Sequence, residues 1–573
     1  MNFRTPGRFL PLLFLAACAQ MPGKSAVVAG KPAPRASAGV TSLPNRDLTP
    51  PLLFDFLLGE TALQRGDQDV ATRTYLKLAQ ETRDPRVAQR ATEIALHSRL
   101  AAPAFEAAKL WTELDPDSVP ARQAIAALLV NTGRLDEARP YLEQLLASEG
   151  TKVDEAFMQL NNLLGRNPNK YAVFELVRQL AQPYEALPEA HFALSQAAWF
   201  ASDFDTALSE MKQALALRPE WEAAAIYQGR ILARTSHVDA MDFYKSYLDS
   251  YPRANDTRLT YARLLLMEKK YGEAREQFER LLAENPGNAE VALAVGLLSM
   301  ELREYDIAES NFKKALELEY KDPGLIRFHI GGIYEKTQRF DEAMEWYRSV
   351  TDGTQYIPAQ VRYAMLLTKQ GRMEEAREHL HKLPVATEQQ RAQLIIAEAQ
   401  LLRETGAHRK VYELLSNGLK QLPDHVDLLY DRALAAEKIG KPDIMEKDLR
   451  KLIQLKPDHA HAYNALGYGL VERNDRLPEA LELIEKAVTL SPNDPYIMDS
   501  LGWAHYRMGN LNQGLSYLRQ AFGMNPDPEI AAHLGEVLWV QGIEDEAREV
   551  WKNSLENNPG NETLIGTMKK FMK

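Results

Sequence analysis

The sequence predicts an all-α protein, an α-solenoid in which about fifteen helix pairs stack one after another. The main observation is a repeat of about 34 residues that extends over most of the chain. Small and apolar residues recur at the same offsets in successive units, and the spacing within each half-unit follows the roughly 3.6-residue period of an amphipathic helix. Two units show these positions as Tyr463, Leu466, Gly467, Leu470, Ala480, Ile484, Ala487 and Pro492, and as Met498, Leu501, Gly502, His505, Gly514, Leu518, Ala521 and Pro526.

Small residues are predicted where the two helices of a unit cross, because a missing side chain lets the helices approach closely. The small residues of the first helices include Gly296, Gly331, Gly467 and Gly502, and those of the second helices include Ala274, Ala308, Ala343 and Ala376. Glycine also ends the first helix of many units, where it permits a sharp turn. These breaks are Gly66, Gly133, Gly371, Gly440, Gly509 and Gly542.

The spacing resembles that of tetratricopeptide repeats, and with this resemblance comes the expectation of a right-handed superhelix whose first helices line an inner groove. The predicted units begin near residues 52, 85, 119, 153, 188, 222, 255, 289, 324, 357, 392, 426, 460, 495 and 528. The unit from 153 to 187 matches the pattern least well. We therefore predict a solenoid over residues 52–561, closed by a capping helix over residues 562–573.

The first residues predict a lipoprotein signal peptide. Arg4 and Arg8 precede a short apolar stretch that is too short to span a bilayer, and Leu15, two alanines and Cys18 follow it. This arrangement resembles the lipobox of bacterial lipoproteins, in which residues 1–17 would be removed and Cys18 would carry the acyl chains. Residues 18–51, rich in Ala, Pro, Gly and Ser, would form a tether with a reach of about 30 Å. The alternative is an ordinary signal peptide in which Cys18 is incidental.

The single cysteine fits lipidation, because an exported chain rarely retains an unneeded thiol. Alanine rather than aspartate follows Cys18, and by analogy with lipoprotein sorting this favours the outer membrane, with the protein facing the periplasm. The net charge of −11 makes nucleic acid a poor partner. No stretch beyond the signal approaches the roughly 18 apolar residues that a membrane span requires.

No catalytic site is predicted. The sequence lacks H-E-x-x-H and G-x-S-x-G motifs, and the stretch from Gly165 to Lys170 lacks the second glycine and the hydroxyl residue of a P-loop. His459 and His461 lie in a turn between units without further metal ligands at suitable spacing. We therefore expect no enzyme activity, metal, cofactor or small-molecule substrate.

Protein partners are expected to bind in the groove. By analogy with tetratricopeptide folds, the groove positions of the C-terminal units are Asn464, Tyr468, Asp499, Trp503, Tyr506, Arg507, Glu536 and Trp539. Exposed aromatic rings at such positions would offer a large contact area at little entropic cost. A weaker second patch is Phe192, Trp199 and Phe200. The alternative is that neighbouring helices cover these rings and make them part of the core.

Several segments are more specific than a generic repeat, namely residues 82–95, 465–468, 499–503 and 528–539. Together with the lipobox, they resemble the proteobacterial outer-membrane tetratricopeptide lipoproteins of the LbcA type, which are similar in role to NlpI. The resemblance implies an adaptor that binds a carboxyl-terminal processing serine protease and presents substrates such as peptidoglycan hydrolases to it. The alternative is a scaffold lipoprotein for exopolysaccharide export, a pilus secretin or outer-membrane protein assembly.

Overall fold

The computed structural model describes residues 44, 46–148, 152–165 and 167–572, and these residues contain 31 α-helices and no β-strand. The predicted all-α class is therefore confirmed. Cys18, the predicted signal peptide and most of the predicted tether lie outside the described residues. None of the described helices is long and apolar enough to cross a membrane.

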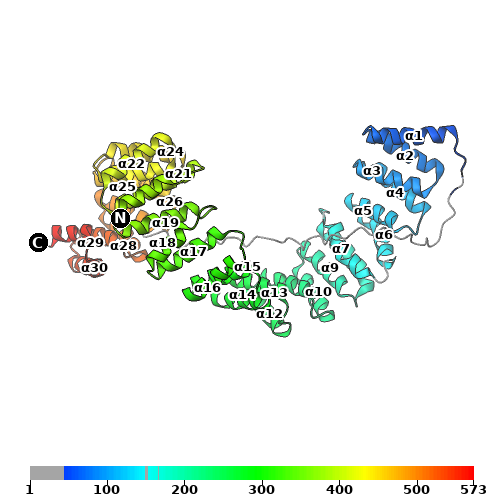
Figure 1. Cartoon of the computed structure of the whole chain (residues 1–573), viewed down its shortest axis with the longest axis horizontal. Coiled ribbons are helices and arrows are strands. Elements are labelled where there is room, and N and C mark those ends of the chain that lie inside the picture. Colours follow the sequence, from blue (N-terminus) through cyan, green and yellow to red (C-terminus); the bar gives the residue numbers. More distant parts are fainter. Residues whose placement is uncertain (1–43, 45, 149–151, 166, 573) are drawn as a thin grey trace. The chain divides into compact units, whose positions relative to one another are not determined.

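The helices divide into two compact units, α1 to α16 and α17 to α31 (Figure 1). The first unit consists of α1 (Pro50–Gln64), α2 (Gln68–Thr82), α3 (Pro85–His97), α4 (Ala101–Leu114), α5 (Val119–Asn131), α6 (Leu135–Ser148), α7 (Val153–Leu164), α8 (Lys170–Ala181), α9 (Pro188–Phe200), α10 (Phe204–Leu217), α11 (Glu222–Ala233), α12 (His237–Ser250), α13 (Asn255–Met267), α14 (Tyr271–Glu284), α15 (Ala289–Glu301) and α16 (Tyr305–Glu317). The second unit consists of α17 (Pro323–Lys336), α18 (Phe340–Arg348), α19 (Tyr356–Lys369), α20 (Met373–Lys382), α21 (Glu388–Glu404), α22 (His408–Gln421), α23 (Val426–Lys438), α24 (Pro442–Leu455), α25 (Ala460–Glu472), α26 (Leu477–Leu490), α27 (Pro495–Arg507), α28 (Leu511–Met524), α29 (Pro528–Val540), α30 (Glu544–Asn557) and α31 (Glu562–Phe571).

The odd-numbered helices up to α29 are the first helices of fifteen pairs, and α31 follows the last pair. Most of them begin at the residue where the repeat spacing places a new unit; α1 and α21 begin two and four residues earlier, at Pro50 and Glu388. In most pairs the second helix packs on the first, and it also packs on the first helix of the next pair. The prediction of about fifteen stacked pairs is confirmed.

The pair formed by α7 and α8 departs from this pattern. α7 packs mainly on α9, whereas α8 packs on α6 and α9. The connection between them is held by Asn167, which is buried and donates from its side-chain amide to the carbonyl of Val130 at 3.3 Å. Its side-chain oxygen accepts from the backbone N–H of Asn169 at 2.9 Å. These bonds tie the turn to α5 and explain why this unit departs from the repeat pattern.

Close helix contact at the predicted small residues is also confirmed. A Cβ added to Gly502 would lie 3.0 Å from the carbonyl oxygen of Gly514, and one added to Gly535 would lie 2.0 Å from Nε1 of Trp551. Trp551 is completely buried, so it has little room to move. The second helix of a pair therefore sits against the bare backbone of the first. The turn glycines Gly509 and Gly542 have φ values of +86° and +81°, which favour glycine.

We expect Gly535→Ala to destabilise the last repeats by about 2 kcal/mol, because the new methyl group would overpack the contact with Trp551. Hydrogen exchange of the α29 and α30 amides measures this effect locally. The matched control is Gly566→Ala in α31, where an added Cβ meets nothing within 4 Å. That change should be neutral or stabilise by up to about 1 kcal/mol, because alanine favours the helix. Equal exchange in the two variants would contradict the prediction.

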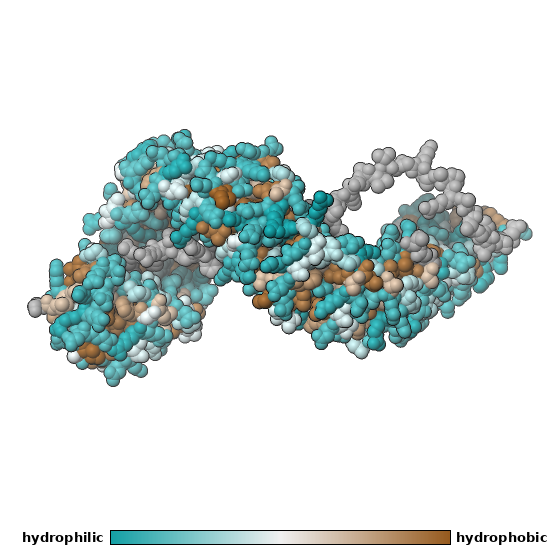
Figure 2. Space-filling model, turned by 90° about the horizontal axis from the view of Figure 1, so that it is seen from below, coloured by the Kyte–Doolittle hydropathy of each residue, from teal (hydrophilic) through white to brown (hydrophobic). Residues whose placement is uncertain are grey.

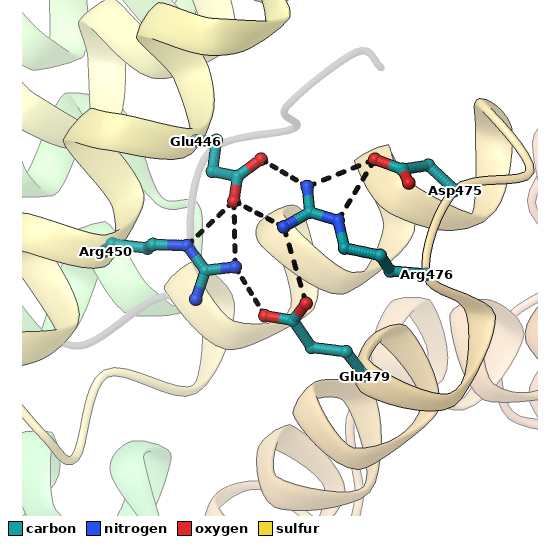
Figure 3. A network of polar contacts seen from close by, with 5 residues as sticks. All are labelled: Glu446, Arg450, Asp475, Arg476 and Glu479. Atoms are coloured by element: carbon teal, nitrogen blue, oxygen red, sulfur yellow. Dashed lines mark hydrogen bonds and ion pairs between the residues drawn. The ribbon is translucent and has the colours of Figure 1, made fainter.

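An ionic network connects successive second helices in the second unit (Figure 3). Glu446 of α24 accepts from Arg476, which precedes α26, at 2.6 Å, and from Nε of Arg450 at 2.8 Å. Arg450 and Arg476 also pair with Glu479 of α26. The hydrogen bond from Arg476, followed by that from Arg450, lowers the pKa of Glu446 to about 2. The stabilisation is therefore complete above the ordinary pKa of a glutamate and is lost as the pH falls towards 2.

Candidate protein-binding surface

Three first helices, α25, α27 and α29, bring most of the predicted groove residues together. α25 packs against α27, and α27 packs against α29. We call the group that they form the C-terminal cluster, and its members are Tyr468, Glu472, Asp499, Trp503, Tyr506, Arg507, His533 and Glu536. The cluster therefore lies within one compact unit.

Trp503 lies at the centre of the C-terminal cluster. Its ring stacks on the imidazole of His533, with centroids 4.2 Å apart and planes 19° apart, and the ring of Tyr506 lies 4.9 Å away. Its indole N–H donates to Glu472 at 2.6 Å. Only 6% of Trp503 is exposed, so the expectation of an open ring is wrong for this residue. The side chains of the neighbouring first helices cover it.

The imidazole of His533, which stacks on Trp503, also forms an ion pair with a buried carboxylate. Nδ1 of His533 is 2.9 Å from Oδ2 of Asp499, and Asp499 is 7% exposed. Burial lowers the pKa of His533, but the nearby Asp499 carboxylate outweighs burial and leaves the pKa above its ordinary value. When it is protonated, His533 is held by Asp499 on one side and by the face of the Trp503 ring on the other.

Carboxylates dominate the surroundings of Tyr468. Burial, and then the charges of Glu472, Asp499, Glu529 and Glu437, raise the pKa of Tyr468 well above its ordinary value. The phenol therefore stays neutral. Of the carboxylates near it, Asp499 is paired with His533 and Glu472 lies 3.8 Å from Arg507.

Further polar groups of the C-terminal cluster surround the Trp503 stack. Glu536, which is 8% exposed, accepts from the hydroxyl of Tyr506 and from Nζ of Lys570 in α31, both at 3.1 Å. Burial, and then the charge of Glu536, raises the pKa of Tyr506 to about 12. Arg507 lies 3.8 Å from Glu472, whose side chain is 44% exposed. Glu472 is therefore the most accessible carboxylate of these contacts.

The other two predicted groove residues have different surroundings. Trp539 is half-buried, and its ring packs on Trp551 and Phe571 and beneath the guanidinium of Arg548. It thus holds the capping helix α31 in place. Asn464 is buried, and among the described residues its side-chain oxygen has no hydrogen-bond partner. A partner-binding role for either residue stays a prediction.

The second predicted patch is only partly at the surface. Phe192 is 5% exposed and packs on Trp221 and Tyr227, so its expected exposure is wrong. Trp199 is half-buried against Phe204. Phe200 remains exposed, with Nζ of Lys170 5.9 Å from its ring centroid. A band of apolar surface also crosses an otherwise mostly hydrophilic face of the middle repeats (Figure 2).

Sequence reasoning missed His533 and Lys570. A sequence signal for His533 existed, because it follows Asp499 by 34 residues and so occupies the same position in the next repeat. An aspartate and a histidine at equivalent positions of neighbouring first helices are candidates for a direct contact. Lys570 had no such signal, because the capping helix lies outside the repeat pattern. Among the described residues, no group of three His, Cys, Asp or Glu side chains is placed to hold a metal ion.

Comparison with known proteins identifies the family. Tetratricopeptide repeat models match residues 192–255, 232–298, 293–356, 430–495 and 500–562. The TPR repeat-containing protein PA4667 of Pseudomonas aeruginosa is 34% identical over 486 residues, which cover 84% of this chain and 82% of that protein. The chain belongs to the tetratricopeptide repeat family. Tetratricopeptide repeats are protein-binding modules, so the chain is a protein-interaction scaffold.

Two further similarities are more limited. The cellulose synthase operon protein C of Pseudomonas fluorescens is 25% identical over 272 residues, which cover 44% of this chain and 21% of that protein. Among solved structures, the thermophilic TPR protein TTC0263 of Thermus thermophilus covers 32% of this tetratricopeptide chain and 99% of its own, with 22% identity and a TM-score of 0.30.

Proposed function

We propose that this tetratricopeptide protein is a lipid-anchored adaptor of the outer membrane that binds a carboxyl-terminal processing serine protease in the periplasm and presents peptidoglycan hydrolases to it. The strongest support for this function is the location of the four segments that resemble the adaptor family. Three of the four, residues 465–468, 499–503 and 528–539, fall on α25, α27 and α29, and they carry Tyr468, Asp499, Trp503 and Glu536 of the C-terminal cluster. The segments that suggest the adaptor family therefore build one surface.

A repeat scaffold suits an adaptor for a physical reason. Successive helix pairs provide many separate surfaces along one chain, so that a protease and its substrate can bind at the same time. Their encounter then takes place at an effective concentration set by the scaffold. Glu472, whose side chain is 44% exposed, would be the carboxylate of the C-terminal cluster that a basic segment of one of these partners contacts.

The test is a reconstituted cleavage reaction. The soluble form that begins after Cys18, residues 19–573, is mixed with the processing protease and one hydrolase, and we expect cleavage to accelerate at least about tenfold. Glu472→Gln keeps an acceptor for the indole N–H of Trp503 but removes the charge, so it should weaken binding severalfold. Glu482→Gln, on the exposed side of α26, is the matched control. Absence of a complex and of acceleration would refute the adaptor function.

Lipidation is tested separately. We expect Cys18→Ala to release the protein into the soluble periplasm or to leave its signal uncleaved, because the thiol is the acyl acceptor. Fractionation of envelopes followed by immunoblotting measures this, and replacement of Ser25 by alanine in the tether is the control. A Cys18→Ala protein that still fractionates with the outer membrane would contradict lipidation at this residue.

The second candidate function is a scaffold for an envelope export or assembly machine. The observation that favours it is the similarity to cellulose synthase operon protein C over 272 residues. Under this alternative, the solubilised protein would co-purify with a β-barrel or secretin subunit and not with a protease.

A further inference from the structure

The first helix of the solenoid is oriented with its apolar side outward. In α1, exposed fractions are 65% for Phe54, 55% for Leu57, 48% for Phe56, 42% for Leu53 and 38% for Leu58. Monomeric soluble proteins rarely leave so many large apolar side chains together in contact with water. This face of α1 is therefore a candidate binding surface.

The orientation of α1 is fixed by its inner face. Asp55 is 8% exposed and accepts from Nζ of Lys77 in α2 at 2.8 Å. Gly59 lies against the ring of Tyr75, which an added Cβ would approach to 2.9 Å, and the Tyr75 hydroxyl donates to Glu60. Rolling α1 to bury its leucines and phenylalanines would break these bonds and force side chains into the space beside Gly59. The helix therefore keeps its apolar side outward.

We propose that this face of α1 inserts into the surface of a phospholipid bilayer and holds the start of the solenoid against the membrane. The proposal rests on the proposed anchor at Cys18 for how α1 reaches the lipid. Thirty-one residues, 19 to 49, separate Cys18 from α1. Such a linker gives a root-mean-square reach of about 30 Å, so α1 is the first helix to meet the bilayer.

The chemistry of α1 also indicates which lipids matter. The helix contains no Lys or Arg, and its only charged residues are Asp55 and Glu60 on the side that packs on α2. Attraction to anionic headgroups therefore contributes little, and insertion of the apolar side chains drives binding. Binding should accordingly be insensitive to salt and should not need anionic lipid.

The experiment is vesicle flotation of the soluble form that begins after Cys18, residues 19–573, with phosphatidylethanolamine–phosphatidylcholine vesicles, with and without phosphatidylglycerol. We expect the wild-type chain to float with both kinds of vesicle. A Phe54→Ser, Leu57→Ser double variant should partition at least about tenfold less, because it loses the two most exposed side chains of the face. The matched control is Val238→Ser with Met267→Ser, which removes residues that are 60% and 68% exposed elsewhere in the same unit.

Three outcomes would overturn the proposal: no flotation of the wild-type chain, equal flotation of the two double variants, or flotation that requires phosphatidylglycerol. A change from dimer to monomer in the Phe54→Ser, Leu57→Ser variant during sedimentation, without a change in flotation, would assign the face to a second copy of the chain instead. Circular dichroism of the two double variants is the check that both of them fold. Because the assay contains no acyl chain and no protease, its failure is distinct from a failure of the proposed adaptor function.

Discussion

Replacing Trp503 by alanine is expected to lower the local unfolding free energy of the C-terminal repeats by about 3–5 kcal/mol. The indole is 6% exposed, stacks on His533 and donates to Glu472, so its removal leaves a cavity and removes a hydrogen-bond donor from Glu472. Hydrogen exchange of α25, α27 and α29 measures the loss repeat by repeat. Global two-state analysis does not apply to a repeat array of this length.

The matched control for Trp503→Ala is Tyr496→Ala, in the first turn of the same helix. Tyr496 is 38% exposed, and its contacts are hydrogen bonds to Asp527 and Asn525 at the surface. Its loss should cost less than about 1 kcal/mol. Unchanged exchange in Trp503→Ala, combined with a large loss of partner affinity, would show that the ring is a binding contact and not part of the core.

Asp499→Asn is expected to destabilise the same repeats by about 3 kcal/mol at pH 5.5 and by clearly less at a pH above the folded pKa of His533. Asp499 raises the pKa of His533 above its ordinary value, despite the opposing effect of burial. A raised folded pKa means that the pair stabilises the protein fully below the ordinary pKa of histidine, and that this contribution is lost as the pH rises through the folded pKa. Without the Asp499 carboxylate, burial lowers the pKa of His533 against only the smaller opposing charges of Glu472 and Glu529, so the pKa falls.

Hydrogen exchange of α25, α27 and α29 at pH 5.5 and at a pH above the folded pKa of His533, which NMR titration locates, measures the effect of Asp499→Asn. The control is Glu482→Gln, which removes a carboxylate from an exposed position of α26 and should change stability by less than about 0.5 kcal/mol at either pH. An equal loss below and above the folded pKa of His533 in Asp499→Asn would show that charge on His533 plays no part.

The repeat spacing predicted most of the fold because each helix pair is specified locally. A glycine such as Gly502 or Gly535 permits close contact between helices, and a turn glycine such as Gly509 ends the first helix; both are visible in the sequence. The hydrogen bond from the buried Asn167 to Val130 of α5 could not be predicted, because its partner lies 37 residues away and the repeat pattern does not specify it.

The candidate site was predicted less completely, because a groove position identifies the side of a helix but not what covers it. Trp503 and Tyr468 occupy equivalent predicted positions, yet His533 from the next repeat stacks on Trp503 and closes it off. The predicted exposure of Phe192 is wrong for the same reason, because Trp221 and Tyr227 from the following repeat cover its ring. Whether a side chain at a groove position is exposed therefore depends on the neighbouring first helices as well as on its own helix.

The outward face of α1 was not predicted either. Its sequence is apolar almost all the way round, so periodicity gives no preferred side. The choice is made by Asp55 and Gly59, which fit against Lys77 and Tyr75 of α2. A polar pair and a close contact therefore decide which side of an apolar helix faces the solvent.

The most direct measurement for an envelope adaptor is affinity purification of the full-length protein from solubilised envelopes, with partners identified by quantitative mass spectrometry. We expect a carboxyl-terminal processing protease and at least one peptidoglycan hydrolase to be enriched, and both to decrease in Glu472→Gln but not in Glu482→Gln. Enrichment of a secretin, a β-barrel or polysaccharide-export subunits without any protease would contradict the adaptor function.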